Sequence, residues 1–232
     1  MTDTRAIQAR AHNRYPIFLN VAAKNALVVG GGHVAMRKVI TLLDYGARVC
    51  VVAKDITAVI ADLADDGRIE LHNRAYTEGD CAGCMLVFCA TNDEGLNKQV
   101  FADAHAAGAL CNVVDVPNLC DFYVPSVLTR GKLQIAVSTN GASPAAAREL
   151  RHELEDVVDG HWEAYLDLLS QVRASMLADS HMSPTGRGAV LKRVATPRVR
   201  GFVFKRLSAG EGISAHELIE MIKRGMCSGD AA

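Results

Sequence analysis

The chain has 232 residues, half of them hydrophobic, with a formal net charge of −1 at pH 7. That length and composition allow a sizeable core, in one large domain or in a domain with a smaller partner. The balanced charge gives no overall attraction to nucleic acid or to a membrane surface. No run reaches the roughly 20 apolar residues of a bilayer-spanning helix, and the N-terminal sequence up to Pro16 lacks the apolar core of a signal peptide. We therefore expect a cytoplasmic protein.

The first half of the chain alternates short apolar runs with helical patterns. One helix is expected between the first two runs, ending at Tyr45 before Gly46, and a second is expected to begin at an Asp55 cap and run to Ala64. A third is expected to open within residues 91–93. Such alternation predicts an α/β domain with a Rossmann-like, doubly wound parallel sheet. The expected strands are residues 26–30, 48–53, 69–73, 85–90 and 110–114.

The pattern changes after about Pro125. Two strands are expected around Arg130-Gly131, followed by a turn at Asn140-Gly141. Ser143 can then cap a helix whose first residue is Pro144. That helix has an apolar stripe at helical spacing, formed by Ala147, Leu150, Leu154 and Val157.

The rest of the chain is predicted to be helical. From Trp162 onward apolar residues recur at helical spacing, and Ser214 with Glu217 forms a capping box for the last helix. No Asp or Glu occurs from Ser180 to Gly210, whereas basic residues are frequent there. This basic stretch is interpreted either as a solvated, partly disordered face or as a surface that attracts a polyanion.

The seven cysteines do not suggest a disulfide framework. Their number is odd, and Cys50, Cys89 and Cys111 lie in expected strands, as is typical of small buried side chains in a reducing compartment. Cys81 and Cys84 form one CxxC, without the second pair that a structural zinc site usually needs. We expect a plain loop there, with zinc or redox chemistry as the less favoured alternative, and no metal held by protein side chains.

The stretch "LVVGGGHVAMRK", residues 27–38, fits a dinucleotide-binding loop between a strand and a helix. Gly30 permits the tight turn, Gly32 lets backbone amides approach a pyrophosphate, and Ala35 lets the helix pack closely on the strand. The N-terminus of the following helix favours the phosphate charge. His33, inside the loop, is interpreted either as a contact to cofactor or substrate or as a solvated side chain.

Two sheet-edge positions complete the candidate site. Asp55, after the second strand, can hold an adenosine ribose or cap a helix, whereas Lys54 would favour a 2′-phosphate, so NAD is preferred over NADP without being fixed. Asp115 is expected at the carboxyl end of a central strand, where it can act as a general base near a nicotinamide, or else as a turn residue before Pro117. Thr91, Asp93 and Asn112 are expected along the same edge, with turn and cap roles as alternatives.

Several blocks in order resemble one family. They are "YPIFLNV", "ALVVGGGHVAMRK", "LLDYGARVCVVA", "FCATND" and the long block from Asn112 to Glu155, beginning "CNVVDVPNLCDFYVPS". Together they resemble the precorrin-2 dehydrogenase family, the sirohaem-synthase N-terminal module. The similarity runs from about Tyr15 to Glu155, and the tail beyond Asp156 matches only loosely.

The resemblance implies NAD-dependent oxidation of precorrin-2 to sirohydrochlorin, for sirohaem or cobalamin-type tetrapyrroles, by a homodimer. Its important aspartate maps onto Asp115, and its nucleotide contacts map onto His33-Val34 and Lys54-Asp55. The implied parts are an NAD-binding domain (1–124), a small β-rich dimerisation region (125–157) and a helical C-terminal domain (158–232) that completes the active-site cleft. The cofactor contacts expected are Gly30, Gly32, His33, Val34, Ala35, Lys54, Asp55 and Thr91.

Precorrin-2 is a polycarboxylate, so basic residues near the long block suit it. The candidate substrate contacts are Asn112, Arg130, Ser138, Asn140, Ser143 and Arg148. Some family members also insert Fe2+ into sirohydrochlorin. Metal insertion would need a base for the pyrrole N–H protons, and Asp115 is preferred to His152 for that role. The sequence does not decide whether this chain inserts metal.

Two other function classes remain. One is a non-catalytic NAD-sensing module, against which the block from Asn112 to Pro144 argues. The other is a methyltransferase using S-adenosylmethionine on a Rossmann-like sheet. The sequence has no Tyr-x-x-x-Lys pair, no HExxH motif and no Gly-x-Ser-x-Gly elbow, which argues against three further enzyme classes.

Overall fold

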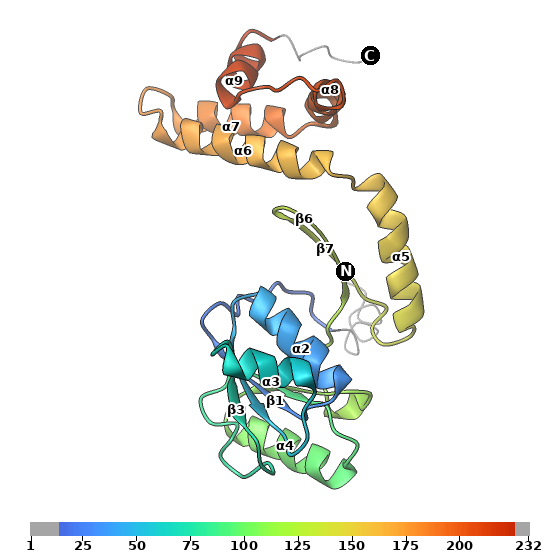
Figure 1. Ribbon diagram of the computed structural model, residues 1–232. Coiled ribbons are helices and arrows are strands. Elements are labelled where there is room, and N and C mark those ends of the chain that lie inside the picture. The colour runs from blue at the N-terminus through green and yellow to red at the C-terminus, as the bar shows by residue number, and fades with distance from the viewer. Residues whose placement is uncertain (1–13, 226–232) are drawn as a thin grey trace, which may run out of the picture. The chain divides into compact units, whose positions relative to one another are not determined.

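A computed structural model describes residues 14–225 (Figure 1). The chain divides into two compact units, the first ending at Val124 and the second beginning at Pro125. Cys227 and the residues before Arg14 lie outside the described residues. Within them, none of the helices is long and apolar enough to cross a bilayer.

The first unit is built on a five-stranded parallel sheet with the strand order β3-β2-β1-β4-β5. The order reverses between β1 and β4, which makes this the switch point where open α/β sheets bind ligands. All four residues of β4 are buried, as its continuous apolar run predicts. The strands are β1 (Asn25–Val29), β2 (Arg48–Val52), β3 (Glu70–His72), β4 (Leu86–Cys89) and β5 (Leu110–Val113).

Helices cover both faces of this sheet (Figure 1). On one face, α2 (His33–Asp44) and α3 (Ala58–Asp65) pack their apolar residues against β1, β2 and β4. On the other face, α4 (Glu94–Ala106) packs Val100 and Ala104 against β4 and β5. The predicted Rossmann-like, doubly wound sheet is confirmed.

Two details of the prediction are wrong. Asp55 does not cap α3: its N-cap is Thr57, whose backbone N–H donates to Gly31 O, so the chain turns into the helix two residues later. The strand before Asp115 is not central, since β5 lies at the edge of the sheet. A single antiparallel bridge between Asn112 and Cys120 lies along that edge.

The second unit begins with an antiparallel hairpin of β6 (Ser126–Arg130) and β7 (Leu133–Val137). Helix α5 (Pro144–Val157) follows, with Ser143 as its N-cap, as predicted. Its apolar stripe is only partly covered within the chain: Ala147 is buried, but Leu150 is 47% and Val157 73% exposed.

The rest of the second unit is a bundle of four helices. These are α6 (His161–Ala178), α7 (Pro184–Val194), α8 (Pro197–Ser208) and α9 (Ala215–Lys223), and their buried residues form one core. The capping box of Ser214 and Glu217 is present. The interpretation of the basic stretch as partly disordered is wrong, because residues 184–208 lie mostly in α7 and α8, where Arg200 stacks on Trp162 at 4.9 Å.

Candidate functional site

The glycine loop is packed too tightly for side chains at its first two positions. Gly30 has φ +116, and a Cβ there would lie 2.4 Å from Ala90 O. At Gly31 a Cβ would lie 2.2 Å from Asp55 O. The loop therefore runs in direct backbone contact with the chain that leaves β4 and β2, and Gly31 is a requirement that the motif reading missed. The signal for it was the run of three consecutive glycines, where the motif itself needs only Gly30 and Gly32.

The third glycine is open. A Cβ at Gly32 would meet nothing within 4 Å, and Gly32 is the N-cap of α2, where no side chain accepts from the helix amides. The first amides of a helix have no partner within the helix, so the N-terminus of α2 is available to an anion. Ala35 is fully buried, as predicted for the small packing position. His33 is exposed and Val34 half-buried in this first turn.

The segment after β2 lies against this loop. Asn73, which follows β3, donates from its side chain to Ala53 O at 3.1 Å and to Lys54 O at 2.9 Å. Lys54 and Asp55 are both exposed. The structure thus brings the glycine loop and the Lys54–Asp55 segment together. Neither the Lys54 nor the Asp55 side chain caps a helix, since the N-cap of α3 is Thr57.

Thr91 has a structural role in the loop after β4. Its hydroxyl donates to Asn97 Oδ1 at 2.6 Å, and the same oxygen accepts from the Cys89 thiol at 3.0 Å. Asn97 Nδ2 returns a bond to Thr91 O at 3.3 Å. Asn97 is 5% exposed and was not singled out from the sequence. Asp93 caps α4 by accepting from Leu96 N, the cap alternative left open for it.

Asp115 is the second residue after β5 and has φ +61, in the left-handed backbone region. Among residues other than glycine, Asp and Asn tolerate that region best. Its side chain is exposed. Because β1 and β5 are parallel to β4, the glycine loop and Asp115 both lie at the carboxyl ends of the strands, on the same side of the sheet. The two strands are separated by β4 alone.

Lys38 connects α2 with Asp115 electrostatically. Burial lowers the pKa of Lys38, the neighbouring Arg37 lowers it further, and the Asp115 carboxylate acts in the opposite direction. Its ammonium lies 5.7 Å from the centre of the Phe88 ring. Lys38 belongs to the quoted glycine stretch, but its position in the second turn of α2 gave no sign that it would interact with Asp115, which follows β5.

The side-chain amide of Asn112 is hydrogen-bonded within the fold. Asn112 is 8% exposed, and its amide donates to Phe122 O at 2.8 Å, which fastens residues 117–122 against β5. Asn112 therefore holds the loop after Asp115, and the substrate contact expected of it stays a prediction.

Most candidate substrate residues of the second unit form hydrogen bonds within that unit. Arg130 donates to Val158 O and Thr129 O, Ser143 caps α5, and Ser138 accepts from the backbone of Asn140. Arg148 is exposed. His152 is bonded to Arg151 and lies 3.5 Å from Glu155. The structure gathers no binding constellation from these residues within the second unit.

Comparisons with known proteins agree with the geometry. Residues 17–126 match a family of putative NAD(P)-binding domains, and residues 130–156 match the central region of sirohaem biosynthesis proteins. The solved structure of SirC, a precorrin-2 dehydrogenase, superposes with a TM-score of 0.72 and 24% identity, covering 91% of this chain and 98% of that one. That similarity shows a shared fold.

Curated relatives with the name siroheme synthase are more similar in sequence. The protein of Nitrosococcus oceani is 38% identical over 90% of this chain and 44% of its own length. The protein of Methylococcus capsulatus is 42% identical over 68% and 33%, and that of Pseudomonas aeruginosa is 37% identical over 88% and 43%. The chain thus spans less than half the length of these relatives.

Proposed function

Because the chain belongs to the family of siroheme synthase N-terminal modules and precorrin-2 dehydrogenases, we propose that it oxidises precorrin-2 to sirohydrochlorin with NAD. The observation that carries the proposal is the common sheet edge of the glycine loop and Asp115. One group binds a dinucleotide, and the other can accept a proton.

The residues present fit the cofactor. The backbone at Gly30 and Gly31 leaves no space for a Cβ, whereas Gly32 faces open space at the uncapped start of α2. Amides of residues 33–35 would hold the pyrophosphate, and Lys54 and Asp55 would contact the adenosine end. Bound NAD supplies the hydride acceptor.

Asp115 serves as the general base in this proposal. Dehydrogenation of a saturated carbon pair removes a hydride from one carbon and a proton from its neighbour, so a carboxylate beside the substrate takes the proton. Asp115 carries this carboxylate in the short turn between β5 and Pro117, where its backbone is left-handed. Lys38 is near enough for its ammonium to interact with this carboxylate.

We also propose that the protein works as a homodimer in the cytoplasm, through residues 125–157. The exposed apolar side chains of Leu150 and Val157 on α5 support a partner surface there. The six described cysteines are free thiols, which suits a reducing compartment. Leu150→Glu should shift the dimer to monomer in light scattering; a monomeric wild-type protein would contradict this part.

The decisive assay mixes the purified protein with precorrin-2 and NAD+ and follows NADH absorbance. We expect NADH and sirohydrochlorin to form in equal amounts. NAD binding without any tetrapyrrole binding would instead support the NAD-sensing module. A parallel reaction with sirohydrochlorin and Fe2+ shows whether the protein also accelerates metal insertion above the spontaneous rate.

A further inference from the structure

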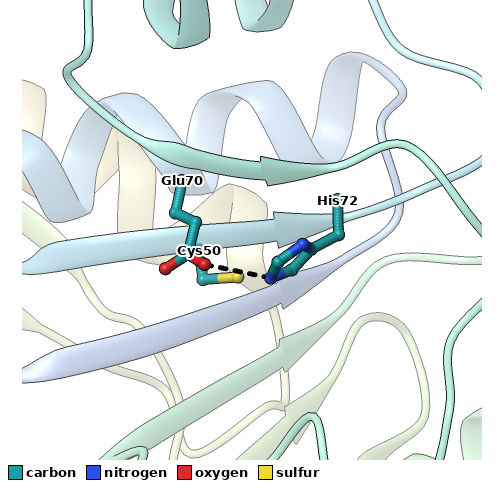
Figure 2. Close-up of side chains that lie close together, drawn as sticks. All are labelled: Cys50, Glu70 and His72. Carbon is teal, nitrogen blue, oxygen red and sulfur yellow. Dashed lines mark ion pairs between the residues drawn. The ribbon is translucent and has the colours of Figure 1, made fainter.

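Three side chains of different chemistry converge on the β2–β3 edge of the sheet. Cys50 of β2 pairs in register with Glu70 of β3, and His72 follows two residues later on the same face of its strand. Figure 2 shows the thiol, the carboxylate and the imidazole pointing toward one another. None of the three takes part in the function proposed above.

The distances suit a small ion. One ligand atom from each side chain lies within 4.8 Å of the other two, and His72 Nε2 is 3.1 Å from Glu70 Oε1. Around tetrahedral zinc, with bonds of about 2.0–2.3 Å, neighbouring ligand atoms are roughly 3.3–3.8 Å apart. Modest side-chain rotations would therefore bring all three atoms into a first coordination shell.

The surroundings leave one side of this cluster open. Helix α4 packs on β4 and β5 on this face, whereas Cys50, Tyr76 and Cys84 pack against the same core and are only partly buried. Glu70 is 70% and His72 38% exposed. A metal ion bound here would keep a fourth position for water.

The other charged groups near Cys50 are already paired with each other. Arg74 holds Asp80 through bonds of 2.7 and 2.8 Å, and this pairing keeps the pKa of Asp80 below its usual range. Cys84, the nearest other thiol, donates to Asp80 O. Glu70 and His72 are thus the groups best placed to share an ion with Cys50.

We propose that Cys50, Glu70 and His72 bind a zinc-like divalent metal ion, with water as the fourth ligand. Thiolate, imidazole and carboxylate are the ligands zinc prefers. Binding breaks the Cys50 S–H bond, forms an Sγ–metal bond and releases the proton to solvent, with no change of oxidation state. The metal would join β3 to β2 directly before Asn73, which holds the Lys54 segment.

This site was not expected from the sequence, which shows no close Cys/His pair. Cys50 and His72 lie on separate strands and are neighbours only because β2 and β3 are parallel and in this register. A one-residue shift would turn Glu70 and His72 to the opposite face.

Metal affinity should rise with pH. Burial, followed by the Glu70 carboxylate, Cys84 and Asp80, raises the pKa of the Cys50 thiol to about 11, while Arg74 acts in the opposite direction. The thiol is thus protonated at neutral pH, and metal binding has to displace that proton. For one released proton, affinity increases about tenfold per pH unit below this pKa.

The test uses the full chain, freed of metal by a chelator and kept reduced. Zinc titrated in a calorimeter should bind at one equivalent, and Co2+ should give a thiolate-to-cobalt charge-transfer band. Cys50→Ser should remove that band, and His72→Gln and Glu70→Gln should each weaken zinc binding by about tenfold or more. Glu70 and His72 are more exposed than Cys50, so their variants should fold and still test the site if Cys50→Ser does not fold.

Two control variants separate this site from other thiols and histidines. Cys84→Ser removes the less buried cysteine of the CxxC, and His105→Gln removes a histidine that pairs with Asp121 at 2.9 Å. Both should bind zinc like the wild type. Absence of stoichiometric binding, or binding that is lost in Cys84→Ser but kept in Cys50→Ser, would overturn the proposal.

Discussion

Glycine-containing turns lead into both α2 and α5, but the two helix starts differ in how their backbone amides are used. At α5, Ser143 accepts from Ala146 N, and Thr139 bonds to both the N–H and the C=O of Ser143. At α2, Gly32 provides no cap, and the glycines before it touch neighbouring backbone. At α5 the cap already provides a hydrogen-bond acceptor for a backbone amide of the first turn, so this helix start serves the fold. At α2 the first amides have no such acceptor, and the preceding loop is held in place by backbone contacts, so this helix start can bind an anion.

The sharpest test of this comparison is Gly31→Ala. The new Cβ would lie 2.2 Å from Asp55 O, a backbone atom that cannot move without displacing the segment after β2. We expect loss of NAD binding and a fall in the free energy of unfolding of several kcal/mol. Calorimetry with NAD+ and denaturant unfolding measure both.

Gly32→Ala is its matched control. No atom lies within 4 Å of the new Cβ, and Gly32 has φ −78, so the fold should be kept. NAD affinity should still fall, because the methyl group would stand at the open helix start. If Gly31→Ala bound NAD as well as Gly32→Ala did, the account of a buttressed loop would be wrong.

A smaller effect is expected at Asn97, which supports the same edge from beneath. Asn97→Ala would leave the Thr91 hydroxyl and the Cys89 thiol without their acceptor in a buried place. An unsatisfied buried group costs about 1–3 kcal/mol. Thermal unfolding should show that loss together with weaker NAD binding, and an unchanged melting temperature would contradict it.

Ser143→Ala should have the smallest effect and is confined to the other helix start. Loss of an N-cap costs about 1 kcal/mol, and NAD affinity should not change. A marked loss of tetrapyrrole binding with normal stability would restore Ser143 as a substrate contact and weaken the distinction between the two helix starts.

Local rules predict much of this fold. Gly30, Ala35 and the buried run of β4 follow from backbone conformation, close packing and burial, which depend on a few neighbouring residues. The Ser214–Glu217 capping box is equally local. Asp55 was predicted as a cap because its residue type is right, but Thr57 takes the position since the turn is set by contact with Gly31.

Contacts between distant segments could not be predicted in the same way. The strand order places β5 at the edge, which single-strand hydrophobicity does not reveal. Arg130 appeared suited to a carboxylate, but its guanidinium donates to Val158 O, 28 residues away. The interaction of Lys38 with Asp115 likewise depends on how α2 lies over the sheet.

The central claim is that cofactor and base share one sheet edge but act separately, and Asp115→Asn tests it most directly. Asparagine tolerates the φ of +61 and keeps the side-chain shape but cannot accept the proton. NAD+ affinity should stay within about twofold, whereas kcat for precorrin-2 oxidation should fall by about 100-fold or more. Unimpaired turnover, or loss of NAD+ binding in step with kcat, would contradict the account.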